Sequence, residues 1–393
     1  MDTYRWTRAE IDLDALWHNL TQFRKALDPQ MKIMAVVKAN GYGHGAVRVA
    51  EEAVSFGIDY LAVAFLDEAL ELRRHGIDAP ILILGYTPPE GVEVAKRHRM
   101  TLTVFDEAVL AEARRLHERA QSDEPPLNIH IKIDTGMGRL GLVGEDRAIH
   151  FIQEALATSG VTVEGLYTHY ACADESDKTY TLMQMNKFKT IVDYFHALGV
   201  TFPVLHAGNT ATGIDMPDYA FNMLRLGIGM YGLYPSEQVN HQRVQLQPMM
   251  SLKTEVVMVK KLPPGSGVSY GARYVTAQEE TIATLPIGYA DGYSRMHSGK
   301  AEALLRGKRV PIVGNICMDQ CMIRIDDTEV AVGDEIVLLG QQGTERITAD
   351  ELAAQLGTIS YEITCMVSHR VPRVYYKQGQ QIEFANPLLA SEK

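Results

Sequence analysis

The feature that most constrains the fold is a series of short apolar, β-type runs between residues 33 and 233, most of them followed by a helix-like segment. This alternation is typical of a parallel sheet covered by helices. Eight strands separated by amphipathic segments such as 67–75, 106–120 and 181–198 favour a closed (β/α)8 barrel over an open doubly wound sheet. The eight runs are IMAVV (33–37), YLAVAF (60–65), PILILG (80–85), TLTVF (101–105), NIHIKID (128–134), VEGLYTH (163–169), FPVLHAG (202–208) and NMLRLGIGMYG (222–232).

The pattern changes after about residue 238, where β-rich runs such as TEVVMVKKL and DEIVLLG are broken by PPG, GSG and GQQG turns. We therefore expect an α/β chain with an N-terminal (β/α)8 barrel over residues 1–238 and a C-terminal mostly-β domain over residues 239–393. The polar segment 234–248 is the natural linker. AEIDL (9–13) precedes the barrel strands, so pairing of residues 1–13 with the β domain is the alternative to a place in the barrel.

Charge and cysteine content argue against several classes of protein. A net charge of −11 disfavours nucleic acid and anionic membranes as partners, because neither is attracted to an acidic surface. No stretch reaches the roughly 20 apolar residues of a membrane span, and the N-terminus lacks a secretory pattern, so a cytoplasmic location is expected. Four cysteines fit a reducing compartment. Cys317 and Cys321 have no histidine nearby to complete a zinc set, so we expect no metal.

The segment MAVVKANGYGHG (34–45) delivers Lys38 from an apolar strand into a loop of Gly, Asn and Tyr. Burial disfavours the ammonium and lowers the pKa of a lysine, which makes the amine a nucleophile for an aldehyde. A solvent-exposed loop lysine is the alternative. In a (β/α)8 barrel, chemistry takes place at the carboxyl ends of the strands, where Lys38, His169 and Asn209 fall.

Nine motifs spread in order over nearly the whole chain resemble those of alanine racemases. They are AEIDLDAL, KANGYGHG, DTGMGRLG, EGLYTHY, FNMLRLGIGMYG, VSYGARY, PIGYADGY, ICMDQCM and TISYE. The resemblance implies a barrel followed by a β domain, pyridoxal 5'-phosphate (PLP) as cofactor, and an isomerase that interconverts L-alanine and D-alanine and supplies D-alanine for peptidoglycan.

The same resemblance implies that Lys38 carries PLP as a Schiff base and acts as one of two catalytic bases. Tyr270 would be the base on the opposite face, because racemisation needs one group to remove the α-proton and another to return a proton to the other side. Lowering a tyrosine pKa from about 10 by ~3 units requires roughly 4 kcal/mol of favourable interaction with the phenolate. His169 and Arg225 are the groups that the resemblance places to supply it.

Arg225 lies in an otherwise apolar strand, where an unpaired guanidinium is costly. The resemblance supplies the pyridine nitrogen of PLP as its partner. An arginine keeps its proton, so the ring nitrogen would accept a hydrogen bond without becoming protonated. A weaker electron sink favours racemisation over transamination. A buried ion pair with an acidic residue is the alternative.

The resemblance also implies further cofactor ligands. Backbone N–H groups and hydroxyls would bind the phosphate. Asn209 and His206 of LHAGNTAT would lie near the cofactor ring, although this segment departs from the commoner H-x-A-N-S. The residues that match the family's phosphate ligands are Tyr42, Thr210, Gly227, Ile228 and Tyr361.

Alternation in NIHIKIDT places Lys132 on the same strand face as His130 and Asp134. The resemblance implies that Lys132 is carbamylated to N6-carboxylysine and orients Arg139. Arg139 would then hydrogen-bond the phenolic oxygen of PLP and approach the substrate carboxylate. An unmodified Lys132 paired with Asp134 is the alternative.

Tyr289, Met318 and Asp319 match family residues that close the substrate entrance. In the family they and Tyr270 come from the partner subunit, so the resemblance implies a homodimer with shared active sites. At Asn315, relatives often have arginine, and the sequence gives no functional account of the difference.

Two other functions fit parts of the sequence. A serine or broader-specificity racemase would use the same lysine and tyrosine, although bulky Tyr361, Tyr289 and Met318 favour a methyl side chain. A non-catalytic PLP-homeostasis protein would need only the barrel, so residues 239–393 count against it.

Overall fold

The computed structural model describes residues 4–119, 125–326 and 328–389. The described residues form two compact units. The first, here called the β unit, comprises the described residues of Met1–Asp14, Tyr42–Gly45 and Pro248–Lys393. The second, here called the barrel unit, comprises the described residues of Ala15–Gly41 and Ala46–Gln247.

In the described part of the barrel unit, eight parallel strands are hydrogen-bonded in the order β8-β7-β6-β5-β4-β3-β2-β9. An isolated bridge between His206 of β8 and Phe221, two residues before β9, nearly closes the barrel. Each of the eight predicted runs overlaps one of these strands, so the predicted (β/α)8 barrel is confirmed. The strands are β2 (Lys32–Val36), β3 (Tyr60–Val63), β4 (Ile81–Ile83), β5 (Thr101–Val104), β6 (Leu127–Lys132), β7 (Val161–Tyr167), β8 (Val204–His206) and β9 (Met223–Leu226).

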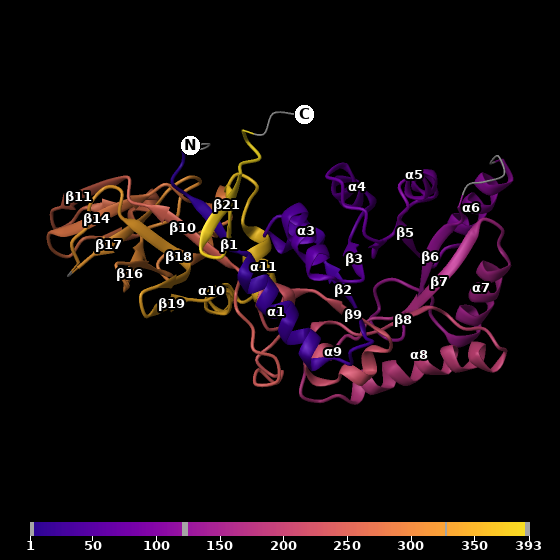
Figure 1. Ribbon diagram of the computed structural model, residues 1–393. Coiled ribbons are helices and arrows are strands. Elements are labelled where there is room, and N and C mark those ends of the chain that lie inside the picture. Colours follow the sequence, from indigo (N-terminus) through magenta and orange to yellow (C-terminus); the bar gives the residue numbers. More distant parts are fainter. Residues whose placement is uncertain (1–3, 120–124, 327, 390–393) are drawn as a thin grey trace. The chain divides into compact units, whose positions relative to one another are not determined.

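Helices cover the outside of these strands, as Figure 1 shows for α4, α5, α7 and α8. The strands are buried on both faces because one face packs on helices and the other faces the barrel interior; all four residues of β3 and of β5 are buried. The predicted helices 67–75, 106–120 and 181–198 correspond to α4, α6 and α8; residue 120 lies outside the described residues. The helices of this unit are α1 (Leu13–Ala26, which begins in the β unit), α3 (Ala46–Phe56), α4 (Leu66–Arg74), α5 (Val92–Arg97), α6 (Glu107–Arg119), α7 (Glu145–Ala157), α8 (Thr179–Ala197) and α9 (Thr210–Asp215), with short 3₁₀ turns η1 (Pro89–Gly91), η2 (Pro217–Ala220) and η3 (Ile228–Tyr231).

The β unit is mostly strand, as predicted for the C-terminal part of the chain. Its main sheet has the order β11-β14-β17-β16-β15-β18-β10-β1-β20-β21, and β19 pairs with β18. The N-terminal strand β1 pairs antiparallel with β10 and parallel with β20, so the first strand of the chain lies in the β unit and not in the barrel. The strands are β1 (Arg8–Asp12), β10 (Met250–Glu255), β11 (Met258–Leu262), β12 (Gly267–Val268), β13 (Tyr274–Val275), β14 (Glu280–Leu285), β15 (Glu302–Leu305), β16 (Lys308–Val313), β17 (Cys321–Ile325), β18 (Glu335–Gln342), β19 (Glu345–Ile347), β20 (Arg373–Lys377) and β21 (Gln380–Ala385).

Short helical segments complete the β unit and connect its strands. They are α10 (Ala349–Leu356), α11 (Ser360–Met366), η4 (Tyr270–Ala272), η5 (Tyr289–Asp291) and η6 (Arg295–His297). No helix within the described ranges is long and apolar enough to cross a bilayer.

Truncating a core leucine tests the barrel. Leu102 on β5 is fully buried, whereas Leu156 on α7 is 44% exposed. We expect Leu102→Ala to lower the free energy of unfolding by about 2–5 kcal/mol because it leaves a cavity. Leu156→Ala should change it by no more than about 0.5 kcal/mol. Urea unfolding followed by circular dichroism measures both, and equal midpoints for the two variants would contradict this description of the core.

Candidate active site

Lys38 lies two residues past the carboxyl end of β2 and is half-buried. The next four residues, Ala39 to Tyr42, all have positive φ, of 52°, 54°, 60° and 52°. Left-handed backbone costs roughly 1–2 kcal/mol for each residue other than glycine. A turn of this kind persists only where its surroundings hold it.

Three hydrogen bonds hold this left-handed turn in the barrel unit. The Ala39 amide donates to Glu68 Oε1 at 2.6 Å, and the Gly41 amide donates to the Val37 carbonyl at 2.8 Å. Asn40 Oδ1 accepts from the Ala46 amide at 3.0 Å. The backbone that carries Lys38 is therefore fixed by bonds on both sides of the strained residues.

The remainder of the KANGYGHG motif, Tyr42–Gly45, belongs to the β unit. The Tyr42 ring is buried with its centre 6.2 Å from that of Tyr361, and burial raises the pKa of its hydroxyl. The Gly43 carbonyl accepts two bonds from the Arg373 guanidinium, at 3.0 and 2.8 Å. A Cβ at Gly43 would lie 2.1 Å from the Thr364 carbonyl oxygen, so only glycine fits there.

Arg225 on β9 is only 4% exposed and donates four hydrogen bonds. Two go to the Nδ1 atoms of His206 and His169, both at 2.8 Å. Two go to the carbonyls of Thr168 and Ala207, at 3.0 and 2.9 Å. Burial lowers the pKa of Arg225 to about 10, so it stays protonated at neutral pH. Among the described residues no carboxylate forms an ion pair with it, so the alternative of a direct ion pair is not found.

His169, just beyond β7, is neutral and has a defined tautomer. Burial, followed by repulsion from Arg225 and Lys132, lowers its pKa well below the usual value. A guanidinium has no acceptor, so the Nδ1 atom that faces Arg225 carries no proton. The proton of His169 therefore lies on Nε2, which is available as a donor.

Lys132 at the end of β6 is buried, with its Nζ atom 4.3 Å from the centre of the Tyr167 ring. Burial, then repulsion from Arg225 and Arg139, lowers its pKa well below the usual value. In the described part of the chain it forms no ion pair. The carboxylate of Asp134, its predicted alternative partner, instead accepts bonds from the Gly136, Gly138 and Arg139 amides; these distances are 2.9, 3.1 and 3.0 Å.

The start of α9 lies against the glycine-rich segment that follows β9. Asn209 caps α9 by accepting from the Thr212 amide at 3.2 Å. The Thr210 hydroxyl oxygen accepts from the Gly227 and Gly229 amides, both at 3.3 Å, and Ile228 is buried beside them. A Cβ at Gly229 would lie 2.6 Å from the Thr210 methyl. The Thr210 hydroxyl, whose oxygen accepts from both amides, keeps its own proton to donate to an anion at this place.

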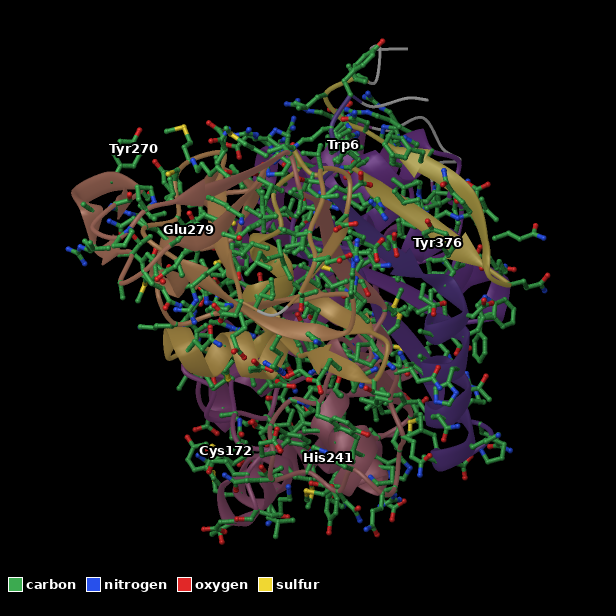
Figure 2. The ribbon with its side chains drawn as sticks, turned by 90° about the vertical axis from the view of Figure 1, so that its left-hand side faces the viewer. Trp6, Cys172, His241, Tyr270, Glu279 and Tyr376 are labelled. Carbon is green, nitrogen blue, oxygen red and sulfur yellow. The ribbon has the colours of Figure 1, made fainter. Side chains whose placement is uncertain are left out.

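Tyr270 opens η4 in the β unit and is 71% exposed; Figure 2 shows its side chain projecting away from the ribbon. Its neighbours Ser269, Gly271 and Ala272 all have positive φ, of 65°, 72° and 44°. Buried Asn315 fixes this strained backbone, because its Nδ2 donates to the Tyr270 carbonyl at 2.7 Å and its own carbonyl accepts from the Ser269 hydroxyl at 2.6 Å. Asn315, whose role the sequence did not explain, therefore positions the backbone that carries Tyr270.

Tyr289, Met318 and Asp319 come together in the β unit. The Tyr289 amide donates to the Cys317 carbonyl, and the Ala290 amide donates to the Met318 carbonyl, both at 3.0 Å. Tyr289 and Met318 are 42% and 52% exposed. Arg370 holds the Asp319 carboxylate at 2.8 Å.

Sequence reasoning missed Tyr167, which lies at the centre of the barrel site. Its ring stacks on that of His206, with centroids 4.5 Å apart and planes 6° from parallel. The Arg225 guanidinium carbon lies 5.4 Å from the ring centre. A signal was available, because strand alternation in LYTH places Tyr167 on the face of His169.

The barrel unit therefore gathers the predicted residues Lys132, His169, Arg225, Thr210 and Gly227, and the charges of Lys38 and Arg139 act on His169. Lys132, His169 and Arg225 are basic or neutral, and within the described chain no carboxylate forms an ion pair with any of these three side chains. Such a set suits a ligand that carries several negative charges, and PLP with an amino-acid carboxylate meets that condition. The buried guanidinium without a carboxylate and the cradle of amides both fit this cofactor.

Comparison with known proteins identifies the family to which the chain is similar. The model of the alanine racemase N-terminal domain matches residues 11–235, and that of the C-terminal domain matches residues 249–375. The alanine racemase of Halalkalibacterium halodurans is 47% identical over 390 residues, 98% of this chain and 99% of the relative.

Two solved structures are similar over nearly their whole length. Alanine racemase from Clostridium difficile 630 has a TM-score of 0.93 and 41% identity, covering 98% of this chain and 99% of that one. Alanine racemase from Bacillus anthracis with bound L-Ala-P has a TM-score of 0.92 and 42% identity, with the same coverage. The chain therefore belongs to the alanine racemase family.

Proposed function

We propose that this protein is a PLP-dependent racemase that interconverts L-alanine and D-alanine. The single observation that carries the proposal is the buried Arg225, which donates four hydrogen bonds and has no carboxylate partner among the described residues. A cation in this state can face a neutral ring nitrogen without protonating it. Family membership makes alanine the expected substrate, and the name of every relative reported above is alanine racemase.

Lys38 would hold the cofactor covalently through its amine. When bound, PLP supplies an aldehyde carbon for the amino group of the substrate and a conjugated ring that delocalises the electron pair left at the α-carbon. Arg225 would donate a hydrogen bond to the ring nitrogen. Asn209, His206 and His169 would line the ring. The phosphate would be held by Tyr42, Thr210, Gly227, Ile228 and Tyr361.

Lys38 and Tyr270 would move the proton, one on each side of the α-carbon. The Nε2 proton of His169 would be donated to the Tyr270 oxygen, which stabilises the phenolate and makes the tyrosine a usable base. We propose that Tyr270, Tyr289, Met318 and Asp319 enter the site from a second subunit, so that the enzyme is a homodimer with shared sites. The high exposure of Tyr270 on a backbone held by Asn315 supports a residue built to meet a partner.

Arg139 would bind the substrate carboxylate, and Lys132 would orient it after modification. A neutral lysine amine attacks CO2 to form a C–N bond and loses a proton, which yields the carbamate of N6-carboxylysine. The lowered pKa of Lys132 favours the neutral amine that this reaction needs. The resulting anion would offset the charges of Arg139 and Arg225.

We also propose that the enzyme works in the cytoplasm and that its D-alanine feeds peptidoglycan synthesis. The bulky side chains of Tyr289, Met318 and Tyr361 favour a substrate with a methyl side chain.

Polarimetry with L-alanine, L-serine and L-lysine tests the activity. We expect racemisation of L-alanine with a kcat/KM at least about tenfold above that for L-serine, because one added group in a tight pocket is worth roughly that factor. No turnover of L-lysine is expected. Faster turnover of serine or lysine would favour the broader-specificity alternative, and no racemisation of any of the three would refute the proposal.

Lys38→Ala should abolish the visible absorbance of the covalently bound cofactor, because no other amine would replace Lys38. Lys189→Ala, at an exposed lysine of α8, is the matched control and should keep the yellow colour. An unchanged spectrum of Lys38→Ala would show that Lys38 does not bind the cofactor.

Tyr270→Phe should slow exchange of the α-proton of L-alanine with solvent deuterium by about 10²–10⁴-fold, while exchange from D-alanine is affected less. Tyr86→Phe, at another exposed tyrosine, should change neither rate. Inactive Lys38→Ala and Tyr270→Phe chains, mixed under subunit exchange, should regain activity in heterodimers with one intact site. Equal losses in both directions would contradict two separate bases, and no regain would contradict a shared site.

Lys132 modification is tested by incubation with 13C-bicarbonate and carbon NMR. We expect a carbamate signal that is lost in Lys132→Ala and kept in Lys178→Ala, a lysine paired with Asp215. Acidification should release the label, because the carbamate forms only from the neutral amine and protonation drives the reverse reaction. If the wild-type protein shows no carbamate signal, Lys132 is not modified and this part of the proposal is wrong.

A further inference from the structure

A chain of polar groups extends from Arg225 through His206 to residues that have no part in the mechanism above. Arg225 contacts His206 Nδ1 at 2.8 Å, and His206 Nε2 lies 2.9 Å from His130 Nδ1. His130 Nε2 faces Glu164 Oε2 at 3.4 Å, and the Tyr60 hydroxyl donates to Glu164 Oε1. Both histidines are fully buried. The five side chains come from β9, β8, β6, β7 and β3, so the chain crosses the barrel.

The direction of every bond follows from its two ends. A guanidinium only donates, so His206 accepts at Nδ1 and carries its proton on Nε2. His206 then donates to His130 Nδ1, which places the His130 proton on Nε2, opposite Glu164. An ionised carboxylate only accepts. Arg225 and Glu164 therefore both favour the tautomer in which the two imidazoles between them carry the proton on Nε2.

The protonation states of the groups agree with this direction. Burial lowers the pKa of His130, and burial with repulsion from Arg225 lowers that of His206, so both rings are neutral. Burial opposes ionisation of Glu164, yet bonds from His130 and Tyr60 bring its pKa below the usual value. Burial and the neighbouring Glu164 raise the pKa of Tyr60, which remains a donor.

The backbone is built to bring Glu164 to His130. In the pairing of β6 with β7, Ile129 faces Val163 and His130 faces Gly165, so Glu164 is an extra residue in a β-bulge. Bulges redirect side chains and are frequent beside active sites. A Cβ at Gly165 would lie 3.0 Å from His130 Nε2, so glycine permits the close approach of the ring. Among the described residues neither His130 Nε2 nor Glu164 Oε2 has a hydrogen bond of full geometry, so the 3.4 Å contact between them is the interaction that these two buried atoms have available.

We propose that Glu164, assisted by Tyr60, is a remote positioning residue for Arg225: its carboxylate fixes His130 and His206 as Nε2–H tautomers, so that Arg225 always meets an acceptor. The proposal concerns the proposed PLP site but depends on it only for its kinetic consequence. With an amide in place of the carboxylate, His130 can accept at Nε2 and donate from Nδ1. His206 would then carry its proton on Nδ1, directed at the guanidinium, and Arg225 would lose one of the bonds that orient it.

Histidine tautomers of the holoenzyme, labelled with 15N-histidine and followed by long-range 15N–1H correlation, test the proposal. Signals are assigned with His130→Asn and His206→Asn. We expect both rings of the wild type to be Nε2–H tautomers. Glu164→Gln should lose this pattern at His130 in part or in full, and Glu164→Asp should restore it. Glu302→Gln, at an acid paired with Arg309 in the β unit, is the matched control and should leave both signals unchanged.

Either ring protonated at Nδ1 in the wild type would overturn the proposal, and this result needs no variant to fold. An unchanged His130 tautomer in folded Glu164→Gln would also overturn it. In the racemisation assay, Glu164→Gln should lower kcat with KM nearly unchanged, since Arg225 does not bind the substrate. A protein without racemase activity but with the expected tautomers would refute the proposed function and leave this inference intact.

Discussion

The burial of Arg225 is the constraint on which the rest of the candidate site depends. A cation removed from water is costly unless hydrogen bonds replace the hydration that it loses. Here two carbonyls and two imidazoles replace it, and no carboxylate does so in the described chain. Because all four partners must accept, the guanidinium places the proton of His169 on Nε2 and favours the same tautomer of His206. One of these histidines faces the proposed chemistry and the other faces the barrel interior.

The concentration of cations also determines which groups remain charged. Burial and repulsion from Arg225 and Arg139 lower the pKa of Lys132, and the same neighbours lower that of His169. Lysine and histidine respond by releasing their protons, whereas the arginines retain theirs. The site thus keeps a preference for anionic groups while it holds a neutral amine and a neutral imidazole. An amine that reacts with CO2 and an imidazole that donates from Nε2 both require these neutral states.

The sequence allowed the barrel to be predicted because parallel strands buried on both faces form continuous apolar runs. Strand ends were less certain: FPVLHAG spans seven residues, but β8 keeps only Val204–His206, since the following residues turn toward the cap of α9. Lys38 was predictable from its place at a strand end. The left-handed turn after it was not, because alanine and tyrosine disfavour that backbone and only tertiary bonds such as Ala39 to Glu68 hold it. Asn315 was noticed as a difference from relatives, but its partner is a backbone carbonyl, which leaves no pattern in the sequence.

Glu164 shows most clearly why part of a site cannot be predicted. Under strict alternation along β7, Gly165 and Tyr167 share one face of the strand and Glu164 lies on the other face. Only the bulge against β6 brings the Glu164 carboxylate to His130. The register of one strand against another decides this, and the register depends on all the side chains packed between them. A neutral imidazole can carry its proton on either ring nitrogen, so two hydrogen-bonded imidazoles do not by themselves fix which nitrogen donates. A fixed donor at one end and a fixed acceptor at the other are both needed to give the chain one state, and the bulge is the element that supplies the acceptor.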